Sequence, residues 1–199
     1  MSNQIETQLE VQLENRNRTT VLFRAFMVIP ASIFLSAFSN WASDNSDAAT
    51  WTVGFIVLPP LLALVFRGVY PSYALAFNKA LFELSLRVTS YFVLLTDKYP
   101  AIEPNEVAVT TFPEIEGGTK LNRFLPLFKW FLAIPLYLVG LLYAFYALIY
   151  VVLSWFTILF TGRMSSEAAD VICKVIAYWN RITGYAFLLV TDEYPSFSL

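Results

Sequence analysis

An internal duplication constrains the architecture of this chain more than any local pattern does. Residues 17–30 align without a gap on residues 122–135, and both segments begin with Asn-Arg and end with Ile-Pro. Further matches follow in the same order: Phe66-x-Gly68 with Phe160-x-Gly162, Arg87 and Tyr91 with Arg181 and Tyr185, and Thr96-Asp97-Lys98-Tyr99-Pro100 with Thr191-Asp192-Glu193-Tyr194-Pro195. The sequence therefore predicts two tandem repeats, at residues 17–102 and 121–199, with a segment at 1–16 before them and a cytoplasmic linker at 103–120.

The composition is that of a membrane protein. Apolar residues make up 57% of the chain and charged residues 14%, whereas soluble domains have about 45–50% and about 25%. The formal charge of −2 and the absence of a long basic run predict no binding to nucleic acid.

Four apolar stretches approach the roughly 20 residues that a helix needs to cross a bilayer. They are residues 21–38, 51–66, 124–142 and 144–161. The last two form one apolar run, which we predict to fold as a tight hairpin with its turn near residues 143–146. The second repeat would then lack the counterpart of the polar loop at 39–50.

Two further segments, residues 73–95 and 166–190, are apolar but carry a narrow charged stripe. Lys79, Glu83 and Arg87 are four residues apart, which places them on one helical face. A charge at the bilayer centre costs about 2.5–3.5 kcal/mol on insertion scales, so we predict amphipathic helices at the membrane surface. The predicted fold is thus an all-α integral membrane protein whose two repeats each consist of a transmembrane hairpin and an interfacial helix.

The distribution of charge predicts the orientation. With four spans, all 13 Lys and Arg residues fall on one side, while the opposite loop holds only Asp44 and Asp47. Positive residues mark the cytoplasmic side, so both termini are predicted to be cytoplasmic. Repeats of equal orientation predict a pseudo-twofold axis along the membrane normal.

A short β element is predicted ahead of each repeat. Ile5, Leu9 and Leu13 belong to an apolar series that alternates with Glu and Gln, which is the period of a half-buried strand. Residues 106–112 form a weaker counterpart. The two segments would pair with each other or with a partner protein, and a disordered acidic tail is the alternative.

Several motifs of the second repeat carry a family resemblance. They are Ile134-Pro135, the segment at 158–163, Asn180-Arg181 and the segment at 185–197. These residues resemble the bacterial membrane family known as domain of unknown function 4389, present as two copies. The first copy departs from the pattern at Arg67, Val69 and Ala101. The resemblance implies a location in the bacterial inner membrane and no particular reaction.

The Thr-Asp-x-Tyr-Pro motifs are predicted to close the surface helices, because Pro100 and Pro195 cannot continue a helix and Tyr99 and Tyr194 suit the headgroup level. The functional alternative is an ion pair within each repeat that joins the surface helix to its hairpin. Asp97 and Asp192 would supply the carboxylates, and the predicted bases are Arg87 and Arg181, or Arg67 and Arg163.

Arg24 and Lys129 lie about one turn inside their predicted spans. We interpret them as side chains that snorkel to phosphate headgroups. Pro30 and Pro135 are expected to kink the same spans.

No catalytic constellation is evident. The chain has no His, and Cys173 is its only cysteine, so the commonest general base and metal ligand is missing. We therefore expect a non-enzymatic scaffold or accessory subunit that binds membrane lipids and either a larger membrane protein complex or further copies of itself. A lipid-directed protein that bends membranes or moves lipid, and a small transporter, are the alternatives. No cofactor is identifiable, although the aromatic content leaves a groove for a lipid, quinone or pigment open.

Overall fold

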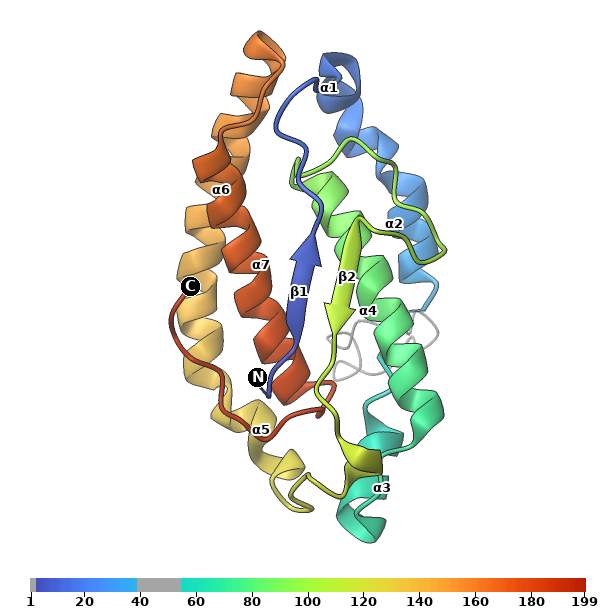
Figure 1. Ribbon diagram of the computed structural model, residues 1–199. Helices are drawn as coiled ribbons and strands as arrows, with labels where there is room; N and C mark the ends of the chain where they lie inside the picture. Colours follow the sequence, from blue (N-terminus) through green and yellow to red (C-terminus); the bar gives the residue numbers. More distant parts are fainter. Residues whose placement is uncertain (1–2, 39–54) are drawn as a thin grey trace, which may run out of the picture.

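Two amphipathic helices form the middle of the fold, between a small sheet and a layer of apolar helices (Figure 1). The computed structural model describes residues 3–38 and 55–199. Its elements are β1 (Glu6–Leu9), α1 (Arg18–Met27), α2 (Ile29–Ser36), α3 (Leu58–Arg67), α4 (Ser72–Phe92), β2 (Ala108–Thr111), the short 3₁₀ helix η1 (Glu116–Gly118), α5 (Pro126–Leu132), α6 (Ile134–Thr161) and α7 (Ser166–Ala186).

The sheet confirms the predicted pairing of the two polar segments. β1 and β2 are antiparallel, with Glu6 opposite Thr111. The inward side chains rest on the two middle helices: Thr110 donates a hydrogen bond to Glu83 of α4 at 2.9 Å, and Asn180 of α7 donates one to Thr7 at 2.8 Å. Glu83, part of the charged stripe predicted for a surface helix, therefore supports the sheet.

The apolar layer consists of α1, α2, α3, α5 and α6. Its longest member, α6, has 28 residues and is about 42 Å long at 1.5 Å per residue. Residues 18–36, which form α1 and α2, and α6 are long and apolar enough to cross a membrane, by length and composition. The remaining helices of the layer, α3 with ten residues and α5 with seven, are too short to cross alone.

The predicted hairpin in the second repeat is wrong. The predicted spans at 124–142 and 144–161 fall on α5 and α6, and α6 continues through residues 143–146 as a single helix. Those residues are Tyr-Ala-Phe-Tyr, without a glycine or proline to break the helix. In the first repeat, the loop at 39–50 with Asp44 and Asp47, and the start of the predicted span at 51–66, lie outside the described residues.

The expected proline kinks are present at matching places. α1 and α2 meet at Val28, and α5 and α6 meet at Ala133. Pro30 and Pro135 are each the second residue of the following helix, where the missing N–H removes no intrahelical hydrogen bond. Both repeats therefore break their first apolar helix at Ile-Pro.

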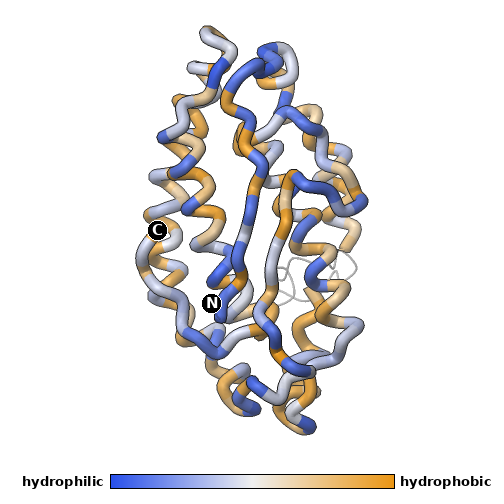
Figure 2. The backbone as a smooth tube through the Cα atoms, in the orientation of Figure 1, coloured by the Kyte–Doolittle hydropathy of each residue, from blue (hydrophilic) through white to orange (hydrophobic). Residues whose placement is uncertain are grey.

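The predicted amphipathic helices exist as α4 and α7, but their apolar faces contact protein. In the described chain α7 has no exposed large apolar side chain, and α4 has only Tyr73 and Phe92, near its two ends. Leu86 of α4 and Ile182 of α7 belong to the buried core instead. Figure 2 shows the resulting segregation, with hydrophobic α6 on one side and hydrophilic loops at both ends of the molecule.

The two halves of the chain run in opposite directions. β1 is antiparallel to β2, and α4 ascends in Figure 1 while α7 descends. α1 contacts α6, and α3 contacts α5, so each half packs the apolar layer of the other. An approximate twofold axis through the sheet would produce this arrangement.

Candidate functional site: paired ion clusters and an apolar groove

Asp97 is the centre of a buried ion cluster at one end of the apolar layer. Its Oδ1 lies 2.8 Å from Nη2 of Arg16 and also pairs with Nη2 of Arg24. Its Oδ2 accepts a hydrogen bond from the backbone N–H of Asn17 at 2.8 Å. The Asp97 side chain is 13% exposed, whereas those of Arg16 and Arg24 are 0% and 3% exposed. One carboxylate therefore neutralises two buried guanidinium groups.

Asp192 occupies the matching position in the second repeat. Its Oδ1 lies 2.6 Å from Nζ of Lys129, and its Oδ2 accepts the backbone N–H of Asn122 at 2.5 Å. The Lys129 side chain is fully buried. The two Thr-Asp-x-Tyr-Pro motifs thus form equivalent contacts with the first helix of their own repeat.

The cation of each cluster makes the same two additional kinds of contact. Arg24 donates to the carbonyls of Tyr91 and Thr96 at 2.7 and 3.0 Å, and Lys129 donates to the carbonyl of Thr191 at 2.6 Å. The Arg24 guanidinium carbon lies 4.4 Å from the Tyr91 ring centroid, and Lys129 Nζ lies 5.3 Å from that of Tyr185. The aromatic faces stabilise cations removed from water.

An asparagine links each aspartate to the start of a helix. Oδ1 of Asn17 accepts the backbone N–H groups of Thr19 and Thr20, and Oδ1 of Asn122 accepts those of Phe124 and Leu125. Asparagine is a favoured N-cap because it satisfies N–H groups that have no partner within the helix. Asn17 is the N-cap of α1, whereas Asn122 holds the turn before α5, whose N-cap is Leu125. Each aspartate binds the backbone N–H of its asparagine.

Electrostatics hold Asp97 in its charged form. Burial alone would raise its pKa, but the hydrogen bonds from Arg16 and the Asn17 backbone, with the charges of Arg16 and Arg24, lower the pKa below its ordinary value. The lowered pKa means that ionised Asp97 stabilises the folded state.

The predicted bases for these carboxylates are wrong. Arg87 donates to the carbonyls of Ala101 and Ile102, at 2.9 and 3.0 Å, and Arg181 donates to Ser196 Oγ and the Ser198 carbonyl, at 3.0 and 2.7 Å. Both arginines therefore bind the segment that follows the Tyr-Pro pair, and burial lowers the pKa of each. The other predicted bases, Arg67 and Arg163, are exposed and make no ion pair with any described residue.

The snorkelling predicted for Arg24 and Lys129 is also wrong. Both side chains point inward, because each helix presents them to an aspartate from the far end of its own repeat. The sequence showed all four residues as repeated, but it gave no reason to join acid and base across such a separation. Arg16 was missed because the second repeat has no basic residue at the matching position.

The Tyr-Pro pairs were predicted to end the surface helices, and this prediction is wrong. α4 ends at Phe92 and α7 at Ala186, several residues before each motif. The chain turns at Leu94 and Leu189, which have positive φ angles of 70° and 57°. Beyond each turn, Pro100 and Pro195 are buried, while Tyr99 and Tyr194 are half exposed.

The two tyrosines pack on the rings that lie beside the cations. The ring centroids of Tyr91 and Tyr99 are 5.7 Å apart, and those of Tyr185 and Tyr194 are 5.6 Å apart. Edge-on contacts of this kind stabilise aromatic pairs. Tyr99 and Tyr194 therefore help to fix the positions of the Tyr91 and Tyr185 rings beside the two cations.

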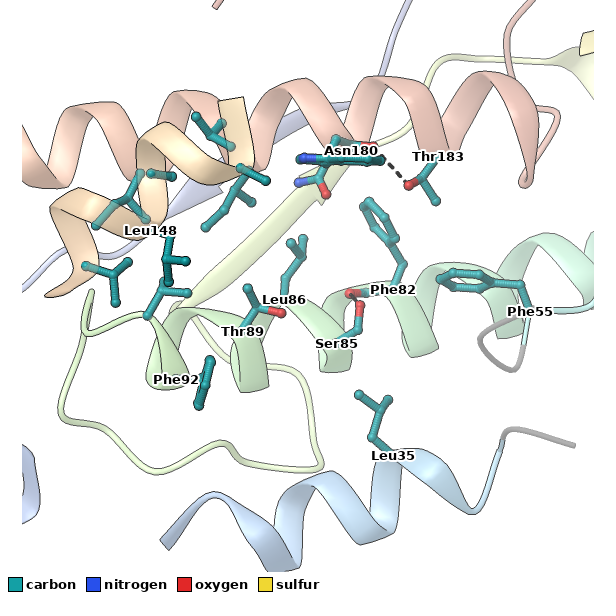
Figure 3. A pocket seen from close by; sticks show the side chains of 18 residues that line it. Leu35, Phe55, Phe82, Ser85, Leu86, Thr89, Phe92, Leu148, Asn180 and Thr183 are labelled. Carbon is teal, nitrogen blue, oxygen red and sulfur yellow. Dashed lines mark hydrogen bonds between the residues drawn. The ribbon is translucent and has the colours of Figure 1, made fainter. Parts of the chain in front are cut away.

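An apolar groove of about 550 Å³ lies between α4 and α7, bordered by α2 and α6 (Figure 3). Its labelled lining includes Phe82, Phe92 and Leu148. The hydroxyl groups of Ser85 and Thr183 donate to carbonyls of their own helices, those of Phe82 and Trp179. Because no Asp, Glu, Lys or Arg of the described chain lines it, the groove suits a hydrocarbon chain better than a charged ligand.

Few groups with catalytic chemistry occur in the described part of the chain. Among residues 3–38 and 55–199, no group of three or more His, Cys, Asp or Glu side chains could hold a metal ion. Burial, with a smaller contribution from Asp170, raises the pKa of Cys173 to about 11, so its thiol is protonated at neutral pH.

Comparison with known proteins identifies one domain. Residues 126–198 match the family described as Domain of unknown function (DUF4389). The match supports the resemblance of the second repeat and finds one copy of the domain. No curated protein and no solved structure matches the chain.

Proposed function

We propose that this chain is a non-catalytic scaffold or accessory subunit of the bacterial inner membrane. The segregation of its surface carries the proposal. Helices α1, α2, α3, α5 and α6 expose many large apolar side chains, whereas α7 and β1 expose none among the described residues. We further take residues 17–102 as a diverged second copy of the domain, because Asp97 and Asp192 make matching contacts.

The packing of the layers favours an orientation parallel to the membrane. α6 packs along α7, and α7 packs against β1 (Figure 1), so an upright α6 would draw charged side chains of α7 and β1, among them Asp170, Lys174 and Glu6, toward the hydrocarbon. Each such charge costs about 2.5–3.5 kcal/mol at the bilayer centre. If the molecule lies flat, the apolar helices enter the cytoplasmic leaflet and the sheet stays in water. This orientation replaces the crossing hairpins expected from the sequence and keeps the approximate twofold axis along the membrane normal.

The outward face of the sheet is then free to contact a partner complex. Val109 points outward from β2 and is 43% exposed, and Thr111 is exposed on the same face, whereas Ala108 and Thr110 are buried. An apolar side chain on an otherwise polar cytoplasmic face suits a protein contact better than water. We therefore place the partner surface on β1 and β2.

Co-purification from native membranes in mild detergent, followed by native mass spectrometry, tests this function. We expect a stoichiometric partner with the unchanged protein, and loss of that partner in Val109→Lys. Lys174→Gln, an exposed change on α7, is the matched control and should keep it. Repeated recovery of a bare monomer from the native membranes would refute the scaffold.

A lipid-directed function is the second candidate, and the same one-sided layer favours it. A protein that inserts into one leaflet expands that leaflet and bends the membrane. Reconstituted vesicles should then form tubules or scramble a labelled lipid. Unchanged vesicles at high protein density would argue against this candidate.

A further inference from the structure

Each end of the molecule carries two exposed arginines around a glycine that ends an apolar helix. Arg67 and Arg123 lie at Gly68, after α3, and Arg18 and Arg163 lie at Gly162, after α6. In each case one arginine comes from the first repeat and one from the second. Figure 2 shows these ends as hydrophilic loops that flank the hydrophobic helices.

The glycines bring the two repeats together. Gly68 and Gly162 have left-handed φ angles of 64° and 73°, which glycine adopts readily. A Cβ added at Gly68 would lie 2.6 Å from Nε of Arg123, and one added at Gly162 would lie 3.5 Å from Nε of Arg18. The Arg123 and Arg18 guanidinium groups therefore each lie against the glycine of the other repeat. Arg67 and Arg163 are the residues next to those glycines in the sequence.

None of these four guanidinium groups makes an ion pair or donates a hydrogen bond to any residue that the structure describes. Two acidic side chains near the ends are already engaged: Glu116 pairs with Lys120 at 2.8 Å, and Asp97 pairs with Arg16 and Arg24. A helix C-terminus favours a nearby cation, but this leaves the N–H donors of each guanidinium available. Two such groups at one place match an anion with several oxygen acceptors.

The neighbouring phenylalanines specify what kind of anion. Phe66 and Phe160 hold equivalent positions, two residues before Gly68 and Gly162. They are 77% and 78% exposed, the highest values among the large apolar side chains described. A site that combines free arginines with an unprotected aromatic ring matches a ligand that has a phosphate and a hydrocarbon chain on one molecule.

We infer that each end binds one anionic phospholipid, with its phosphate on the arginine pair and its acyl chain against Phe66 or Phe160. The inference rests on the orientation given under the proposed function. A flat molecule brings both ends to the headgroup level of the same leaflet, whereas an upright molecule would place them in different leaflets. The two lipids would thus hold the scaffold at a fixed depth.

The test counts lipids that stay bound. The full chain is reconstituted into vesicles of equal parts phosphatidylglycerol and phosphatidylcholine, extracted gently and measured by native mass spectrometry. We expect two phosphatidylglycerol molecules on the unchanged protein, one on Arg67→Gln/Arg123→Gln, one on Arg18→Gln/Arg163→Gln, and none on the fourfold variant. Lys98→Gln/Lys174→Gln removes the same charge from elsewhere on the surface and should retain two.

Equal retention of the two lipid types, or two phosphatidylglycerol molecules on the arginine variants, would overturn the inference. An equal loss in the lysine control would overturn it as well. The substituted side chains are exposed, so we expect each variant to fold. Thermal unfolding in detergent verifies this. Failure of the scaffold function is read separately, because a missing protein partner leaves the lipid count unchanged.

Discussion

The two ion clusters share one backbone arrangement but differ in their cations. Asp97 and Asp192 each accept the backbone N–H of an asparagine and pair with a buried base. The Asp97 cluster has a second arginine, Arg16. The aligned residue in the second repeat is Leu121, which is buried and apolar. The carboxylate and the backbone contacts are therefore the constant part of the repeat, and the number of buried positive charges is the variable part.

Removal of the carboxylates is the strongest way to expose this difference. Loss of one partner from a buried ion pair costs about 3–5 kcal/mol, because it leaves an uncompensated charge. We expect Asp97→Asn near the upper end of this range, since two guanidinium groups lose their partner, and Asp192→Asn near the lower end. Denaturant unfolding in detergent measures both. Equal losses would show that Arg16 adds nothing to the first cluster.

Arg16→Leu leaves the first cluster with one buried cation, as in the second. Arg16 also donates to the carbonyls of Gln12 and Leu94, at 2.8 and 2.7 Å. An unpaired buried polar group costs about 1–3 kcal/mol, so we expect a loss of about 2 kcal/mol in unfolding free energy. Asp97→Asn in this background should then cost no more than Asp192→Asn does. An unchanged effect of Asp97→Asn would contradict the coupling of the two residues.

The position of Gly68 and Gly162 gives a smaller comparison. Alanine in a left-handed conformation costs roughly 1–2 kcal/mol. We expect Gly162→Ala to show this strain alone, and Gly68→Ala to lose more, because its Cβ would meet Arg123 at 2.6 Å. Thermal unfolding compares the two. A smaller loss for Gly68→Ala would mean that the Arg123 side chain moves away without cost.

Acid should weaken the protein through Asp97 in particular. Because its folded pKa is lower than its unfolded value, the ionised carboxylate stabilises the fold at neutral pH, and this contribution disappears as the pH falls below about 4. Unfolding midpoints between pH 3 and pH 7 should fall less steeply for Asp97→Asn than for the unchanged protein. Parallel curves for the two proteins would exclude Asp97 as a source of acid sensitivity.

Local patterns predicted the elements better than their connections. The alternation around Leu9 identified β1, and Ile-Pro located the helix breaks at Pro30 and Pro135. The hairpin at residues 143–146 was wrong, because it was inferred from the length of an apolar run, and length alone does not distinguish one long helix from two short ones. The partners of Asp97 and Asp192 were wrong because acid and base at opposite ends of a repeat meet only when the helices pack.

The sequence alone determined that the chain is apolar, carries matching motifs in its two halves and is built from helices with a small sheet, since composition, repetition and periodicity are properties of the residues themselves. Only the tertiary structure decided which surfaces remain exposed. It buried the apolar faces of α4 and α7 in protein, turned Arg24 and Lys129 inward, and left Arg67 and Arg163 outside. The physical reason is that burial and ion pairing depend on which segments meet across the fold, and in this chain the meeting segments come from distant parts of the sequence.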